Sequence, residues 1–197
     1  MNPQRAIPRL LAAALATSLA HAPAFAENGS ASAQVKRGAQ LVAYGGCADC
    51  HTPFKMGPNG PEKDHARGLS GHPEDLKLPP PPKLDNAWNW GGSATMTAFV
   101  GPWGTTYASN LTPDRATGIG TWREADFIKA LRTGKHLGAT RPILPPMPWQ
   151  SIGTLPDKDL RAIYAYLMAQ PAVKNKVPEY APPVVPVGKV GGGEKGA

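Results

Sequence analysis

The sequence has little of several features that mark common protein classes. It contains only two cysteines, Cys47 and Cys50, and no stretch rich in lysine or arginine. A structural zinc site needs four ligands, which a chain with two cysteines does not readily supply. The net charge of +7 is spread along the chain, so it gives no sign of nucleic-acid binding. No convincing strand pattern is present either, which favours an all-α fold.

One long apolar run is present, and it lies at the N-terminus. Arg5 and Arg9 precede apolar residues 10–20, and the small-x-small sequence of 24–26 follows. This order is typical of a secretory signal, and the run is shorter than the about 20 residues that span a bilayer. We expect residues 1–26 to be a signal peptide cleaved after Ala26. The remainder, which has no other apolar run, is expected to be periplasmic with no transmembrane segment.

The two cysteines belong to one motif. Cys47 and Cys50 are three positions apart, and His51 follows directly. This spacing is the attachment signature of a c-type haem, with two thioether bonds and an axial histidine. A redox cysteine pair would need a strand-helix context, which the preceding segment lacks. A structural disulfide is possible in the same compartment but gives no role to His51, so we expect one covalent haem c.

Three helices are predicted around this motif. The first starts at Ser32 and ends before Gly45, since apolar and small residues recur on one face. The second starts at Thr121, with Thr121 as N-cap and Glu124 completing a capping box, and ends at Gly134. The third covers 156–169, with Pro156 in its first turn.

Long connections separate the predicted helices. Residues 52–93 contain four consecutive prolines, at 79–82, and read as irregular. Such a chain has little ordinary core, so a buried porphyrin would supply apolar surface. We predict an all-α, cytochrome c-like domain over 27–180 whose glycine- and proline-rich loops wrap the haem. Residues 181–197 are predicted to be an extended or disordered tail.

The second axial ligand is predicted to be Met147. Pro146 and Pro148 flank it and fix the local backbone, so the thioether is held at little entropic cost. Met96 remains an alternative, as does one of the histidines or an open site. Histidine and methionine together raise the reduction potential, and a closed iron points to electron transfer rather than catalysis.

The order of these motifs resembles the small monohaem c-type cytochromes. In that family a glycine of the first helix lets the last helix cross closely, and Gly38 and Val42 with Ile163 and Tyr166 match those positions. More narrowly, several motifs resemble the cytochrome c subunits of membrane-associated bacterial dehydrogenases of the alcohol type; they lie at 108–114, 117–122, 132–134 and 146–148. Those subunits usually carry three haem motifs, whereas this chain has one.

The resemblance implies further site residues. Asn110 and Thr112 are candidates for hydrogen bonding to a haem propionate, and Trp103 or Tyr107 for packing at the haem edge. Asn110 and Thr112 also fit an ordinary turn. A basic surround of the haem edge is predicted to guide an acidic partner, and it would consist of Lys36, Lys55, Lys129, Lys135 and Arg141.

The expected function is that of a non-enzymatic electron carrier. It would shuttle electrons between a dehydrogenase and the respiratory chain, with a dehydrogenase, an oxidase or another cytochrome as partner. One alternative is a haem protein with an open iron, either peroxidase-like or a gas or redox sensor. Another is an obligate cytochrome subunit of a larger dehydrogenase.

Overall fold

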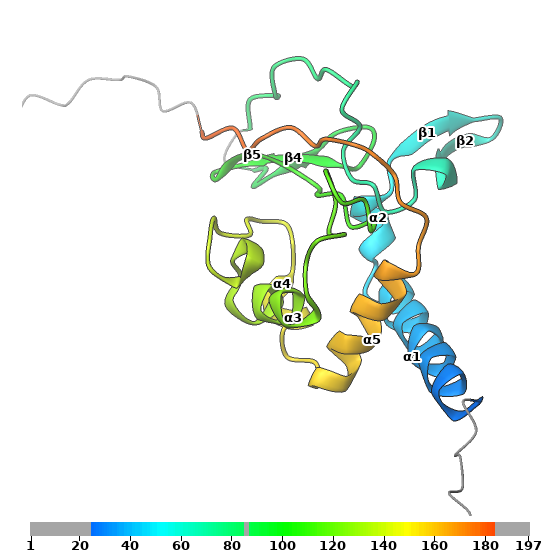
Figure 1. Ribbon diagram of the computed structural model, residues 1–197. Coiled ribbons are helices and arrows are strands. Elements are labelled where there is room, and N and C mark those ends of the chain that lie inside the picture. Colours follow the sequence, from blue (N-terminus) through cyan, green and yellow to red (C-terminus); the bar gives the residue numbers. More distant parts are fainter. Residues whose placement is uncertain (1–24, 85–86, 184–197) are drawn as a thin grey trace, which may run out of the picture.

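The structure is a computed structural model, and it describes residues 25–84 and 87–183 (Figure 1). The predicted signal peptide therefore lies outside the described residues except for its last two positions, and so does the predicted tail beyond residue 183. Among the described residues no helix is long and apolar enough to cross a membrane. The helices are α1 (Phe25–Tyr44), α2 (Cys47–His51), α3 (Glu124–Thr133), α4 (Trp149–Ile152) and α5 (Asp157–Met168).

The all-α prediction is wrong, because the described residues include five short strands that form two antiparallel sheets. One sheet pairs β1 (Phe54–Gly57) with β2 (Gly60–Lys63). The other has the order β3 (Gly91–Gly92), β4 (Ala98–Gly101) and β5 (Gly104–Tyr107). Every strand has four residues or fewer, and glycines stand at several strand ends. Runs this short and glycine-rich give no alternating apolar pattern, so the sequence carries almost no strand signal.

Helices α1 and α5 cross in close contact, as the resemblance implied (Figure 1). Gly38 is buried at the crossing, and a Cβ atom placed on it would lie 1.9 Å from the carbonyl oxygen of Ala162 and 2.7 Å from the Cβ of Tyr166. No side chain fits at those distances. Glycine at position 38 therefore sets how closely the two helices approach.

The core lies between these two helices and α3. Its buried members include Leu160 and Leu167 of α5, which are at most 2% exposed. They pack with the other apolar residues of one cluster, Val42, Leu69, Ile119, Phe127, Leu131 and Ile163. The hydroxyl of Tyr164 donates a hydrogen bond to the carbonyl oxygen of Trp122 at 2.7 Å, which fixes α5 against the start of α3.

The predicted helices are present, with shifted boundaries, and α1 starts at Phe25 rather than at the predicted Ser32. Helix α3 starts at Glu124 and its N-cap is Arg123 rather than Thr121. The Asp126 carboxylate accepts hydrogen bonds from the backbone N–H and the guanidinium of Arg123, at 3.2 and 2.8 Å. This pairing replaces the predicted capping box of Thr121 and Glu124. Helix α5 agrees with its prediction within a residue at each end, and Pro156 is its N-cap.

The chain after α5 returns across the molecule in extended form (Figure 1). We refer to residues 171–183 as the C-terminal segment. It ends its described course beside β5, where Thr105 and Ala181 exchange backbone hydrogen bonds of 2.8 and 3.0 Å. The Tyr180 hydroxyl also donates to the carbonyl oxygen of Trp103 at 2.6 Å. The segment thus joins the helical part to the three-stranded sheet.

Candidate functional site

The two cysteines lie on α2, a helix of a little more than one turn. Gly46 precedes it in the left-handed conformation, with φ of 62°, which glycine adopts without strain. Both thiols are free and half-buried, and burial raises the pKa of each. Positions three apart face the same side of a helix. The helix therefore presents two protonated thiols side by side, with the histidine directly after them.

His51 is buried and held through one ring nitrogen. Its Nδ1 lies 2.7 Å from the backbone carbonyl oxygen of Ser109, so Nδ1–H donates and Nε2 is left as the nitrogen with a free lone pair. Burial lowers the pKa of this imidazole, which keeps it neutral. A neutral imidazole oriented by a carbonyl is the usual form of a metal-ligating histidine.

The backbone around His51 is fixed by the segment that follows η1 (His65–Arg67). The N–H of Gly71 donates to the His51 carbonyl oxygen at 2.8 Å. The N–H of Leu69 donates to the buried Thr52 hydroxyl at 3.0 Å. A Cβ atom on Gly71 would lie 2.2 Å from the carbonyl oxygen of Ala108. Three stretches of chain therefore meet in close contact behind the imidazole.

Met147 is half-buried and borders the same apolar cluster as Cys47 and Ala48 of the motif. Its N–H donates to the Leu144 carbonyl oxygen at 3.3 Å, which closes a tight turn. The carbonyl oxygen of Pro145 accepts a 2.9 Å hydrogen bond from the Thr106 hydroxyl of β5. The thioether predicted as a ligand thus lies in a braced loop beside the cluster that the haem motif also contacts.

The competing side chains have other surroundings. Met96 is 39% exposed, with a positive φ of 55°. His72 is fully buried, with Nδ1 2.9 Å from the Thr97 hydroxyl and Nε2 3.4 Å from the Leu76 carbonyl oxygen. His136 packs edge-on against the ring of Trp122. Both nitrogens of His72 are therefore engaged within the protein, which leaves no lone pair for iron.

Asn110 and Thr112, the predicted propionate contacts, are both buried. Asn110 Oδ1 accepts hydrogen bonds from the N–H and hydroxyl of Thr112, at 2.9 and 2.7 Å. Asn110 Nδ2 donates to the Val173 carbonyl oxygen at 2.8 Å. These bonds lead to the C-terminal segment, and the propionate role stays a prediction.

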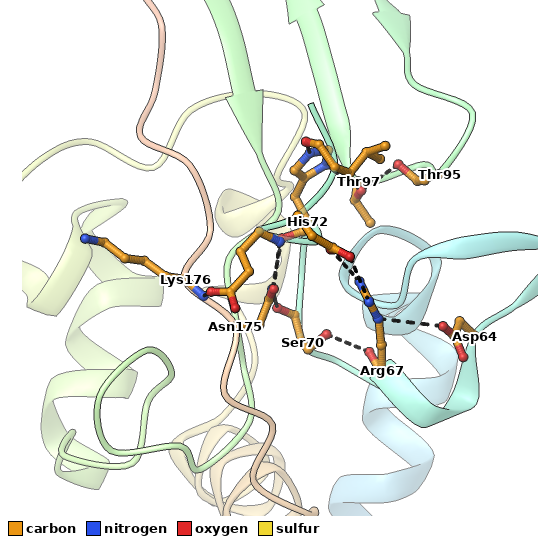
Figure 2. A network of polar contacts seen from close by, with 11 residues as sticks. Asp64, Arg67, Ser70, His72, Thr95, Thr97, Asn175 and Lys176 are labelled. Atoms are coloured by element: carbon orange, nitrogen blue, oxygen red, sulfur yellow. Dashed lines mark hydrogen bonds and ion pairs between the residues drawn. The ribbon is translucent and has the colours of Figure 1, made fainter. Parts of the chain in front are cut away.

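A polar network that the local sequence does not predict joins residues 70–74 to the C-terminal segment (Figure 2). Asn175 is its centre and is only 5% exposed. Its amide group donates to the carbonyl oxygens of Ser70 and His72, at 2.7 and 2.9 Å, and its Oδ1 accepts from the N–H of Glu74 at 2.9 Å. Asn175 stands in a polar, proline-flanked stretch, so nothing in its local sequence marks it.

The donor set fits a covalently attached haem. The chain offers two thiols on one helical face, a neutral imidazole with its Nε2 unused and a thioether in a braced loop. Trp103 Nε1 is buried with no hydrogen-bond partner, and no other side-chain nitrogen or oxygen in 25–84 and 87–183 is so placed. No group of three or more His, Cys, Asp and Glu side chains suited to a bare metal ion occurs in that part of the chain.

Several known proteins are similar in sequence to the chain, although no protein-family model matches it. The chain is 35% identical over 146 residues to one of the subunits of the nicotinate dehydrogenase of Pseudomonas putida. It is 32% identical over 156 residues to the cytochrome c subunit of the quinone-type alcohol dehydrogenase of Gluconobacter oxydans. It is 33% identical over 145 residues to the gluconate 2-dehydrogenase cytochrome c subunit of Pantoea cypripedii.

These matches cover about three quarters of the chain but only part of each relative. The covered share is 74% of the chain and 9% of the Pseudomonas protein, 77% and 25% for the Gluconobacter subunit, and 74% and 25% for the Pantoea subunit. The chain therefore spans a quarter or less of the length of these relatives. The resemblance to cytochrome c subunits of bacterial dehydrogenases, drawn above from the motifs, is confirmed.

Proposed function

We propose, from this similarity to the cytochrome c subunits of dehydrogenases, that the protein is a periplasmic electron-transfer cytochrome with one covalent haem c. The carrying observation is the 2.7 Å hydrogen bond from His51 Nδ1 to Ser109, made by a buried imidazole directly after the two thiols. That bond presents Nε2 for ligation, and burial lowers the pKa of the imidazole, which disfavours its charged form. The relatives supply the electron-transfer role, which their names as cytochrome subunits imply.

Each residue of the proposed haem site has its own role. Cys47 and Cys50 would form the two thioether bonds, His51 would be the proximal ligand and Met147 the distal one. The haem supplies a one-electron iron couple when bound. Hydrogen bonds hold His51 through Ser109 and the Met147 loop through Thr106, so little would reorganise when an electron arrives or leaves. A catalytic role is not proposed, because a methionine at the distal position leaves no place for a substrate.

The proposed partner is a dehydrogenase, since the relatives are subunits of such enzymes. The chain would accept electrons from it and pass them towards the respiratory chain. If the protein is an obligate subunit, a dehydrogenase polypeptide will co-purify with it after mild extraction. If it is a free carrier, it will elute alone and still be reduced by the purified dehydrogenase. Either result is consistent with the electron-transfer role, and the two results distinguish an obligate subunit from a free carrier.

The test is a spectrum and redox titration of the exported protein beside two variants. Met147→Ala is expected to lose the long-wavelength sulfur-to-iron band of the oxidised form and to lower the reduction potential, because the soft sulfur favours Fe(II). Met96→Ala is the matched control and should leave both unchanged. The haem should stay attached in acidified acetone.

Three outcomes would count against parts of the proposal. A colourless protein from a host that matures c-type cytochromes would remove the haem. Matching spectra for wild type and Met147→Ala would remove Met147 as ligand. A high-spin wild type that binds cyanide or CO rapidly would favour the open-iron alternative, a peroxidase-like enzyme or a sensor, over the carrier.

A further inference from the structure

The end of β5 and the residues after it contact His51, one predicted axial ligand, and the loop that carries Met147, the other. At one end, the Thr106 hydroxyl donates to the Pro145 carbonyl oxygen at 2.9 Å, two residues before Met147. At the other, the Ser109 carbonyl oxygen accepts from His51 Nδ1 at 2.7 Å. Only three residue steps separate the two contacts, a length of about 10 Å at the rise of a β-strand.

This stretch, residues 106–109, is itself tightly held. Thr106 and Tyr107 pair with Phe99 and Ala98 of β4. The Tyr107 ring lies 4.9 Å from that of the buried His72, measured between centroids. A segment that is paired with β4 and packed against His72 has little freedom to shift, so it can serve as a fixed reference for what it contacts.

The next residue is fixed through its backbone. The N–H of Ala108 donates to the Thr97 carbonyl oxygen at 2.8 Å, and the Ala108 carbonyl oxygen accepts from the N–H of His72 at 3.0 Å. Ala108 is also buried. Ser109 therefore directly follows a residue whose N–H and carbonyl oxygen are both hydrogen-bonded, which limits how far the Ser109 carbonyl can move.

The loop around Met147 is joined to the sheet through the Thr106 hydroxyl. Among the described residues, a side-chain hydrogen bond joins the β3-β4-β5 sheet to residues 143–148. The Thr106 hydroxyl donates it to the Pro145 carbonyl oxygen. Prolines at 145, 146 and 148 have no N–H to donate, so the loop's own backbone can form few bonds. Loss of this hydroxyl would leave the methionine loop without its tie to the sheet.

We infer that Thr106 is a positioning residue for the distal ligand and that residues 106–109 set the two axial ligands relative to each other. The inference rests on the proposed His51 and Met147 ligation. The segment holds His51 at one end and the Met147 loop at the other, so one stretch of chain would fix both ligands. Thr106 would then oppose release of Met147 by restricting the loop that carries it.

Three variants test this role in the haem-loaded protein. Thr106→Val keeps the shape and removes the hydroxyl, whereas Thr106→Ser keeps a hydroxyl and should behave like the wild type. Thr105→Val is the matched control, because its side chain lies on the other face of the same strand. Circular dichroism of each variant reports whether the fold is intact.

The readouts are the sulfur-to-iron band of the oxidised protein as pH or temperature rises, and the rate of cyanide binding to the ferric form. For Thr106→Val we expect the population that has released Met147, and with it the cyanide rate, to rise about three- to tenfold, as loss of one hydrogen bond implies. Thr106→Ser and Thr105→Val should stay near the wild type.

The possible failures are separable. If the wild type shows the band and Thr106→Val matches it in pH dependence and cyanide rate, the positioning role is wrong and the ligation stands. If Thr105→Val weakens the band as much as Thr106→Val, the effect belongs to the strand in general, which also overturns the role. If the wild type itself lacks the band, the proposed ligation fails.

Discussion

At the scale of single residues, Arg37 and Asp159 form the contact whose contribution depends most clearly on pH. The guanidinium donates two hydrogen bonds to the carboxylate, at 3.0 and 3.1 Å, and so joins α1 to α5. Asp159 is buried, with 7% of its surface exposed. The hydrogen bonds from Arg37 hold the pKa of Asp159 below its ordinary value, which is about 3.9.

Asp159→Asn is expected to lower the melting temperature at neutral pH. A depressed carboxylate pKa contributes stability above the pKa of the unfolded chain, and this stability is lost as pH falls through the lower native value. The difference between wild type and variant should therefore shrink once the pH is below about 4. Thermal melts at pH 7 and in acid measure it, with the exposed Lys77→Gln as control. A difference that stays constant down to strongly acid pH would contradict the assignment.

Individual residues also show what the sequence does and does not reveal. Cys47, Cys50 and His51 are recognisable because covalent haem attachment requires one fixed spacing. Ser109 and Asn175 are not recognisable in that way. Ser109 acts through its backbone carbonyl, which every residue has, and Asn175 acts through partners about a hundred positions away. A contact that any residue could make, or that depends on a distant segment, leaves no local pattern.

At the scale of elements, the crossing of α1 and α5 is the contact most sensitive to a single added methyl group. Gly38→Ala should destabilise the protein by about 3 kcal/mol, because the new Cβ would meet backbone atoms that cannot rotate away. Urea unfolding measures the loss. Gln40→Ala, exposed on the same helix, should change stability little. A loss below about 1 kcal/mol for Gly38→Ala would mean that the helices separate easily.

Helices and strands differed in how well the sequence predicted them. Helices α1, α3 and α5 each bury an apolar face that repeats over several turns, so periodicity located them. The strands are too short for alternation to be seen, even though they pair locally, as Phe54 does with Lys63 and Phe99 with Thr106. The start of α3 was displaced because Asp126 and Arg123 form a capping arrangement outside the usual residue types.

At the scale of the whole molecule, the basic charge bears on partner binding. Of the five residues predicted to guide an acidic partner, Lys55 lies 3.9 Å from Glu62 and 3.6 Å from Asp64. The described residues show no ion pair for the other four, Lys36, Lys129, Lys135 and Arg141. Charges that no ion pair offsets are the ones whose field reaches an approaching protein.

Electron transfer to an acidic partner should therefore slow as salt is added, on the order of tenfold between low and high ionic strength. Stopped-flow reduction at a series of salt concentrations measures this. Lys135→Gln should lower the low-salt rate, whereas Lys55→Gln, whose charge is already offset by Glu62 and Asp64, should lower it less. A rate that does not change with salt would remove electrostatic guidance.

The C-terminal segment has a consequence for the order in which this molecule can be completed. Asn175 and Ala181 bond to parts of the chain made much earlier, at residues 70–74 and 105. Until residues 175–181 have been made, residues 70–74 and Thr105 lack these bonds. In the proposed cytochrome, Cys47 and Cys50 would therefore be open to haem attachment before these contacts form.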